Sequence, residues 1–187
     1  MANTNQTMNT GSSRINRWLR DLWNIGWNRI PSRRIRRQLL KRILGHLSGR
    51  VYVGLNVKLF DPWQIKISDR SLINAGCLID ARGGLVAIAE DVDVGAETHI
   101  WTLEHDPNDP EHGTRGGGVT IEDHVWIATR VTILPNVTIG RGAVIGCGSV
   151  VTKNIPPMAI AVGVPAKVIG ERDNPLTYKL NYNRRFR

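Results

Sequence analysis

The residues best suited to chemistry in this chain are two histidines in one polar segment. Residues 102–118 read TLEHDPNDPEHGTRGGG, which places His105 and His112 among aspartates and glutamates. A histidine exchanges a proton near neutral pH and can therefore serve as a general base. His105 stands at the start of the segment, where a rigid element before it would hold its ring beside open space. The same histidines and acids could alternatively bind a metal ion.

A repeat of six residues indicates the element that must hold this segment. Residues 119–154 divide into the blocks VTIEDH, VWIATR, VTILPN, VTIGRG, AVIGCG and SVVTKN, with an aliphatic residue in the third place of each. A period of six fits neither an α-helix nor a hairpin meander, but it fits a coil with three walls of short parallel strands. An ordinary β-sandwich would rarely keep one register through six blocks. We therefore predict an all-β solenoid in which Ile121 stacks under Ile139 and coils lie about 4.8 Å apart.

The same spacing extends upstream with interruptions. Aliphatic residues six apart form three runs: Val53 and Leu59; Ile67, Ile73 and Ile79; Ile88, Val94 and Ile100. Short slips at residues 62–63 and 82–84 can bulge at corners of the coil. The 21 residues from Ile100 to Ile121 leave a loop at about residues 103–118, and ordered loops of this length are often functional. Fourteen inward places predict nearly five coils within a domain over residues 51–170.

Charge divides the chain into a basic N-terminal segment, an acidic solenoid and a basic tail. The 187 residues carry a formal net charge of +9. Residues 14–50 have eleven basic residues against one acidic, residues 51–172 have ten against fourteen, and residues 173–187 have four against one. We expect the basic tail to begin at about residue 171. Because no nucleic-acid recognition motif accompanies this charge, we expect no nucleic-acid partner.

The basic segment at residues 14–50 predicts two amphipathic helices that are separated at Pro31. Trp18, Trp23 and Trp27 can share one face of the first helix, while isoleucines and leucines line one face of the second. Such helices could cap the open end of the solenoid, whose terminal coil exposes apolar side chains and unpaired strand edges. Helices with tryptophan and arginine on opposed faces could also attach to an anionic membrane surface.

We expect both roles, divided between the two helices. Indoles favour membrane interfaces, so residues 14–30 are predicted to associate with the membrane and residues 31–49 to cap the coil. Residues 1–13 are polar and expected to be disordered, and they lack the apolar core of a signal peptide. The sequence has no run of eighteen apolar residues, so we expect a cytoplasmic protein that is at most peripheral at the inner face of the membrane. Cys77 and Cys147 are expected to be reduced thiols.

Together these features resemble a known family. The hexapeptide coil, the His-Asp-Pro at residues 105–107 and the run VWIATRVTILPNVTIGRGAVIGCGSVVTKNIPPMAIAVGVPAKVI resemble the left-handed β-helix acyltransferases. The chain looks most similar to maltose, galactoside and nodulation-factor O-acetyltransferases, and above all to colanic-acid and capsule acetyltransferases, which also carry an IPSRRIRR-like segment. The resemblance covers roughly residues 29–170. It implies a left-handed coil, a homotrimer, acetyl-CoA as co-substrate in the groove between adjacent prisms, and no metal.

The resemblance also implies roles for particular residues. His105 matches the general base that takes the proton of a sugar hydroxyl as this attacks the thioester. The backbone N–H of Thr129 matches the donor to the oxyanion, although Ala128 stands before it where glycine is commoner. Other matches line the pantetheine arm, lie near the phosphates of CoA, or contact the acceptor: respectively Trp126, Thr129 and Cys147; Thr152, Lys153 and Lys167; Asn74 and Asp80. The match of Asp80 is the less direct, because the alignment slips just after it.

These observations favour an acetyl-CoA-dependent O-acetyltransferase that acts on a sugar hydroxyl of a saccharide or cell-envelope glycan. Three alternatives stay open. The chain could be an N-acetyltransferase of a nucleotide-linked aminosugar. It could be a metal enzyme similar to the solenoid carbonic anhydrases, which distribute three histidines over their walls. It could also be a solenoid subunit that assembles with partners and has no catalytic role.

Overall fold

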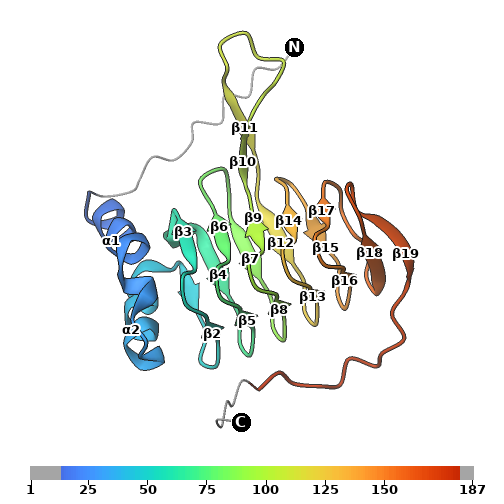
Figure 1. Ribbon diagram of the computed structural model, residues 1–187, viewed down its shortest axis with the longest axis horizontal. Helices are drawn as coiled ribbons and strands as arrows, with labels where there is room; N and C mark the ends of the chain where they lie inside the picture. Colours follow the sequence, from blue (N-terminus) through green and yellow to red (C-terminus); the bar gives the residue numbers. More distant parts are fainter. Residues whose placement is uncertain (1–13, 182–187) are drawn as a thin grey trace.

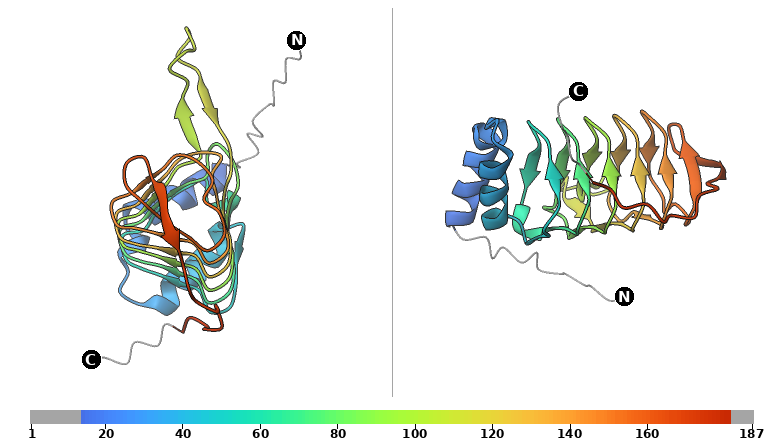
Figure 2. Two further views of the ribbon diagram at one scale, coloured as in Figure 1. Left: turned by 90° about the vertical axis from the view of Figure 1, so that its right-hand side faces the viewer. Right: turned by 90° about the horizontal axis from the view of Figure 1, so that it is seen from below.

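The computed structural model describes residues 14–181, which fold as a left-handed parallel β-helix (Figure 1). Residues 1–13, predicted to be disordered, and residues 182–187 of the basic tail lie outside the described residues. Two helices cover one end of a three-walled prism, a hairpin stands out from its side, and the C-terminal segment runs back along it (Figures 1 and 2). The predicted solenoid is therefore confirmed.

Each wall is a sheet of short strands. Wall A contains β1 (His46–Leu47), β4 (Ile65–Ile67), β7 (Val86–Ile88), β12 (Val119–Ile121) and β15 (Thr138–Ile139). Wall B contains β2 (Tyr52–Val53), β5 (Leu72–Ile73), β8 (Asp93–Val94), β13 (Trp126–Ile127), β16 (Val144–Ile145), β18 (Ala159–Val162) and the antiparallel β19 (Lys167–Glu171). Wall C contains β3 (Lys58–Phe60), β6 (Leu78–Asp80), β9 (His99–Ile100), β14 (Thr132–Ile133) and β17 (Val150–Val151).

The strand register agrees with the stacking expected from the sequence. Ile121 lies beside Ile139 in wall A, and Ile133 lies beside Val151 in wall C. These side chains are fully buried, because the third place of each block points into the prism. The coil makes about six turns where fourteen inward places predicted nearly five. The additional strands are β1 and β18, which lie outside the runs of the repeat.

Three corners join the walls, and the B–C corner matters most for function. It comprises residues 54–57, 74–77, 95–98, 128–131 and 146–149. Left-handed backbone recurs there in every turn, for example at Arg130 (φ 60°) and Gly148 (φ 70°). Successive turns are joined by single hydrogen bonds, such as Gly148 N–H to the Thr129 carbonyl at 3.0 Å. Residues two places after each inward residue of wall B therefore form a straight row along the prism.

Both N-terminal helices cap the first turn. α1 (Arg14–Ile25) is followed by a 3₁₀ turn, η1 (Trp27–Arg29), and by α2 (Arg33–Ile43), whose first turn is capped by the Ser32 hydroxyl. Trp23 is fully buried and donates its indole N–H to the Val57 carbonyl at 2.9 Å. The assignment of residues 14–30 to the membrane and 31–49 to the cap therefore needs correction, because α1 is itself part of the cap.

The boundary between the helical segment and the coil also differs from the prediction. The helical segment was expected to reach residue 50, but α2 ends at Ile43 and β1 already belongs to the coil. Gly45 allows this early turn, since a Cβ there would lie 2.2 Å from the Trp63 carbonyl oxygen. Trp63 belongs to a second 3₁₀ turn, η2 (Pro62–Gln64), at one of the predicted slips.

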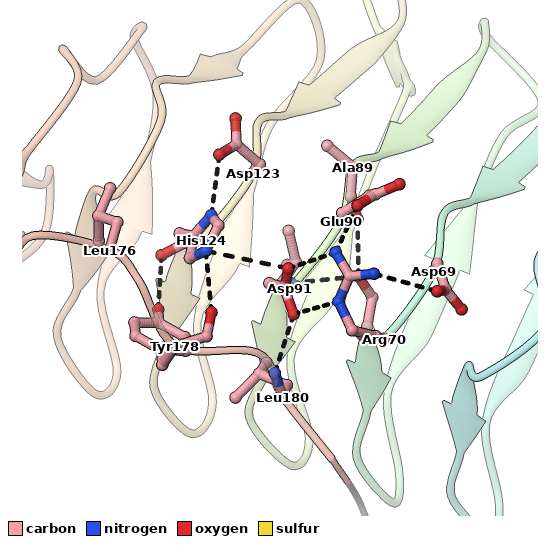
Figure 3. Close-up of polar contacts among 12 residues, drawn as sticks. Asp69, Arg70, Ala89, Glu90, Asp91, Asp123, His124, Leu176, Tyr178 and Leu180 are labelled. Carbon is pink, nitrogen blue, oxygen red and sulfur yellow. Dashed lines mark hydrogen bonds and ion pairs between the residues drawn. The ribbon is translucent and has the colours of Figure 1, made fainter.

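The C-terminal segment packs along the A–B corner (residues 68–71, 89–92, 122–125, 140–143 and 156–158) (Figure 3). Leu176 is buried there. The His124 ring is held between the Asp123 carboxylate (2.8 Å) and the Tyr178 carbonyl (3.1 Å), and Leu180 N–H donates to Asp91 at 2.8 Å. The segment thus crosses three turns and ties them together from outside.

Candidate functional site

The polar segment that carries His105 forms an antiparallel hairpin. β10 (Leu103–His105) pairs with β11 (Thr114–Gly116), and the pair projects from the corner between walls C and A (Figures 1 and 2). The predicted loop thus has a paired base, whereas residues 106–113 form an irregular tip. A cross-strand ion pair, Arg115 to Glu104 at 2.8 Å, stiffens the hairpin. Gly116 is required at its base, because a Cβ there would lie 2.2 Å from the Thr102 carbonyl oxygen.

The His105 ring is oriented by its neighbour across the hairpin. Its Nδ1 lies 2.9 Å from the His112 carbonyl oxygen, and the two imidazole rings stack with centroids 4.0 Å apart. A carbonyl oxygen only accepts hydrogen bonds, so Nδ1 carries the proton in a neutral ring. Nε2 is then the basic nitrogen. A backbone carbonyl thus orients the His105 ring.

The predicted pantetheine residues lie together along wall B and the B–C corner. Trp126 is 49% exposed on β13, and Thr129 and Cys147 are exposed at equivalent places in successive turns. Within residues 14–181, the N–H groups of Thr129 and Cys147 donate to no protein acceptor. This corner therefore offers a row of free N–H donors next to an exposed indole. Gly95 keeps the row open, since a Cβ there would lie 2.7 Å from the Thr129 nitrogen.

The predicted phosphate-binding residues lie at the far end of the prism from the helices. Thr152 and Lys153 are exposed just after β17, the last strand of wall C. Lys167 is exposed at the start of β19. The chain is folded so that Ala166, next to Lys167, donates its N–H to the Val150 carbonyl at 2.8 Å. The two lysines thus flank the same end of wall C.

Asn74 and Asp80 lie in different places. Asn74 is at the B–C corner, where its amide donates to the Asp93 carboxylate and to the Val94 carbonyl, each at 2.9 Å. Asp80 ends β6 in wall C, one turn below the base of the hairpin, and it is fully buried. Its carboxylate is paired with Arg82 at 2.7 Å. Asp80 therefore holds a turn of the main chain, whereas Asn74 lies at the same corner as Thr129 and Cys147, in an earlier turn.

The predicted site residues of a single chain fall into two halves, which lie on two corners. The B–C corner presents Trp126, Thr129 and Cys147, while His105 projects from the C–A corner across the width of wall C. The hairpin leaves the prism between β9 and β12. It therefore follows the turn that contains β8 and precedes the turn that contains Trp126. The two halves therefore lie at a similar height along the prism but face different sides.

The other histidine cluster has a structural explanation. His124 lies near two acids, but its Nδ1 contacts the Asp123 carboxylate and its Nε2 donates to the Tyr178 carbonyl of the C-terminal segment (Figure 3). Within residues 14–181, no three side chains of His, Cys, Asp and Glu are grouped as metal ligands would be. None of the helices among these residues is long and apolar enough to cross a membrane.

Comparison with known proteins assigns this parallel β-helix of hexapeptides, with its one protruding hairpin, to a class of transferases. The family model described as bacterial transferase hexapeptide (six repeats) matches residues 118–153. A curated Staphylococcus aureus (strain COL) protein that bears the name "putative acetyltransferase" is 34% identical over 145 residues, covering 75% of this chain and 72% of the relative.

Two solved structures extend the likeness. A hexapeptide-repeat acetyltransferase of Vibrio cholerae O1 biovar eltor, complexed with acetyl coenzyme A, has a TM-score of 0.82 and 25% identity, covering 89% of this chain and 92% of that one. A maltose O-acetyltransferase from Clostridium difficile 630 has a TM-score of 0.78 and 29% identity, covering 87% of each chain. The chain belongs to the hexapeptide-repeat acetyltransferases and is an acetyltransferase. The resemblance to the O-acetyltransferase branch is confirmed, while the nearer likeness to colanic-acid and capsule enzymes stays a prediction.

Proposed function

We propose that this chain is an acetyl-CoA-dependent O-acetyltransferase that acetylates a hydroxyl of a saccharide or cell-envelope glycan. The observation that carries the proposal is the hydrogen bond from His105 Nδ1 to the His112 carbonyl. It leaves Nε2 as a proton acceptor at the edge of an exposed hairpin. A sugar hydroxyl is a poor nucleophile until a base takes its proton, so an oriented neutral imidazole is the group that O-acetylation needs.

The reaction would proceed by addition and elimination. The hydroxyl oxygen attacks the thioester carbon of acetyl-CoA while its proton passes to His105 Nε2. The carbonyl oxygen becomes an oxyanion, which the free N–H of Thr129 can stabilise. Collapse of the tetrahedral intermediate breaks the carbon–sulfur bond, and the imidazolium returns the proton to the departing thiolate. The products are the acetyl ester and CoA.

Acetyl-CoA would lie along the B–C corner of one prism. Its pantetheine arm would pass the indole of Trp126 and the free N–H groups of Thr129 and Cys147, since amides of the arm need such donors. Its phosphates would reach the end of the prism where Lys153 and Lys167 are exposed beside Thr152. We further propose a homotrimer, because the His105 half of one chain then meets the Thr129 half of its neighbour.

We also propose that the helical end of the molecule binds an anionic membrane surface. Trp23 and Trp27 pack into the cap, but α1 keeps an outer face on which Ile15, Trp18 and Ile25 are 67%, 63% and 74% exposed. Arg14 and Arg17 are exposed on the same helix. Apolar side chains next to arginines suit the interface of an anionic bilayer. Attachment there would concentrate the enzyme beside acceptors held on lipids.

The experiment compares His105→Ala with His112→Ala in assays with acetyl-CoA and a panel of neutral sugars and aminosugars, with products identified by mass spectrometry. His105→Ala should lower kcat by about 10²–10⁴ and leave acetyl-CoA affinity unchanged in calorimetry. His112→Ala retains the carbonyl that orients His105 and loses only the stacked ring, so it should cost far less. The opposite ranking would remove His105 from its role. Exclusive acetylation of amino groups would favour the N-acetyltransferase.

A further inference from the structure

Asp93 is an isolated carboxylate on the outer face of wall B. In the ladder of this wall it lies between Leu72 of the turn below and Trp126 of the turn above. No arginine or lysine pairs with it among residues 14–181. Partial burial among these neighbours raises the pKa of the Asp93 carboxyl, a shift that the Asn74 hydrogen bond opposes. A partly buried acid without a basic partner lowers the stability of the fold, so its presence here suggests a functional role.

The hydrogen bonds of Asn74 leave two oxygen atoms free. Both protons of the Asn74 amide are used, one on Asp93 Oδ1 and one on the Val94 carbonyl. The amide is therefore fixed, with its oxygen directed away from these acceptors. Among the described residues no donor reaches Asn74 Oδ1 or Asp93 Oδ2. Two hydrogen-bond acceptors thus stand side by side next to the exposed indole of Trp126.

These three groups suit one kind of ligand. Adjacent acceptors bind a ligand with adjacent hydrogen-bond donors, and an exposed indole packs against an apolar face of similar size. A sugar ring offers both, because neighbouring hydroxyls lie on its edge while C–H groups form its face. Asp93 precedes the hairpin within the same turn, and Trp126 belongs to the next turn. The groups therefore lie at the height at which the hairpin of a neighbouring chain would bring His105.

We propose that Asp93, together with Asn74 and Trp126, forms the acceptor subsite, and that Asp93 Oδ2 and Asn74 Oδ1 accept hydrogen bonds from two neighbouring hydroxyls of an uncharged sugar. The inference rests on the proposed function and adds the class of acceptor to it. A carboxylate at the subsite repels a second carboxylate or a phosphate on the sugar ring, because like charges at contact distance disfavour binding. Neutral hexosides are accepted, and uronic acids, sialic acids and sugar phosphates are rejected.

The test uses Asp93→Asn, Asp93→Leu and the control Glu90→Gln. Glu90 is an exposed acid of the A–B corner that pairs with Arg70, so its loss removes one negative charge on another side of the prism. Initial rates would be measured against acetyl-CoA, a neutral hexoside and the matching hexuronate, and thermal unfolding would be followed for each variant. The ratio of the rates of the wild-type enzyme on the neutral hexoside and on the hexuronate is the reference for the variants.

Asp93→Leu should raise the KM of the neutral acceptor by about 10- to 100-fold, as expected for loss of hydrogen bonds to a charged group. Asp93→Asn should lower the preference for the neutral sugar over the uronate by about 10-fold or more, because the repulsion is removed. Both should leave the KM of acetyl-CoA as in Glu90→Gln, and neither should lower the unfolding temperature, because the partly buried acid itself costs stability.

Unchanged acceptor KM and unchanged preference would overturn the inference while the proposed function stood. Losses that follow the unfolding temperature, or that fall equally on acetyl-CoA, would assign Asp93 a structural role and overturn it as well. If the wild-type enzyme acetylates no saccharide at all, the proposed function fails and the inference fails with it.

Discussion

At the scale of single residues, the two cysteines occupy one corner of the prism but differ in environment. Cys77 is fully buried, its Sγ lies 3.2 Å from the Gly95 carbonyl oxygen, and burial raises its pKa to about 11. Cys147 is exposed two turns beyond Gly95 in the same corner, next to the groove proposed for pantetheine. A thiol reacts as the thiolate, so Cys77 is protected both by its pKa and by its burial.

We therefore expect iodoacetamide at neutral pH to modify Cys147 and not Cys77 in the folded protein. Acetyl-CoA at 100 times its dissociation constant should slow the modification of Cys147 by about 100-fold, in proportion to the free enzyme that remains. Peptide mass spectrometry over a time course measures both. A control with Cys147→Ala should show no labelling until denaturant is added. Equal labelling with and without acetyl-CoA would place the pantetheine arm elsewhere.

The sequence could predict residue identity at the site better than residue contacts. Trp126, Thr129 and Cys147 lie at exposed positions, because the repeat fixes which residues turn outward, and their contacts with acetyl-CoA stay a prediction. The family pattern gave Asn74 and Asp80 as a pair, but the structure separates them and buries Asp80 against Arg82. Asp93 has no signal of its own in the sequence. The role proposed for Asp93 depends on Asn74 and Trp126, which lie 19 and 33 residues away in the sequence. They come next to Asp93 only because the turns of the coil stack.

At the scale of elements, the repeat predicted the three walls well, but it did not predict the hairpin or the path of the C-terminal segment. Alternating burial in short strands follows from a period of six, so walls A, B and C could be placed from residues alone. The hairpin was expected as a loop, because its pairing depends on Glu104 meeting Arg115 across a polar tip. The path of the C-terminal segment was not foreseen. It rests on contacts such as that of Tyr178 with His124, which are far apart in the sequence.

The outer face of α1 gives the prediction that belongs to this scale. Removing residues 1–30 would also remove Trp23 and uncover the first turn, so exposed side chains are the better target. Replacing Ile15, Trp18 and Ile25 by serine should abolish co-sedimentation with vesicles that contain anionic lipid. Activity on a short soluble acceptor should be retained, because α1 lies at the capped end, away from the hairpin (Figure 1).

The apolar and the electrostatic parts of this binding can be separated. Binding of the unaltered protein should weaken with added salt and should be absent on vesicles of neutral lipid, since arginines contribute through the surface potential. A matched control replaces Val164, which is 71% exposed near the opposite end of the prism, by serine and should bind as the unaltered protein does. If the triple variant sediments like the unaltered protein, α1 serves only as a cap.

At the scale of the whole molecule, the separation of the two half-sites argues for assembly. His105 and Thr129 project from different corners of the prism, so the site proposed for acetyl-CoA would not close within one chain. A closed ring of three parallel prisms would repeat the same contact three times and form three equal sites. Light scattering should then give about three times the chain mass of 20.8 kDa.

Mixed trimers test whether each site takes residues from two chains. His105→Ala removes the base, and Cys147→Trp fills the groove at an exposed position, so each variant alone should be inactive. When the two are co-expressed in equal amounts, a shared site is intact if an unaltered His105 meets an unaltered Cys147. That combination arises at about a quarter of the sites, so about a quarter of the activity should return. If each chain built its own site, every site would carry one defect, and mixed trimers confirmed by native mass spectrometry would stay inactive.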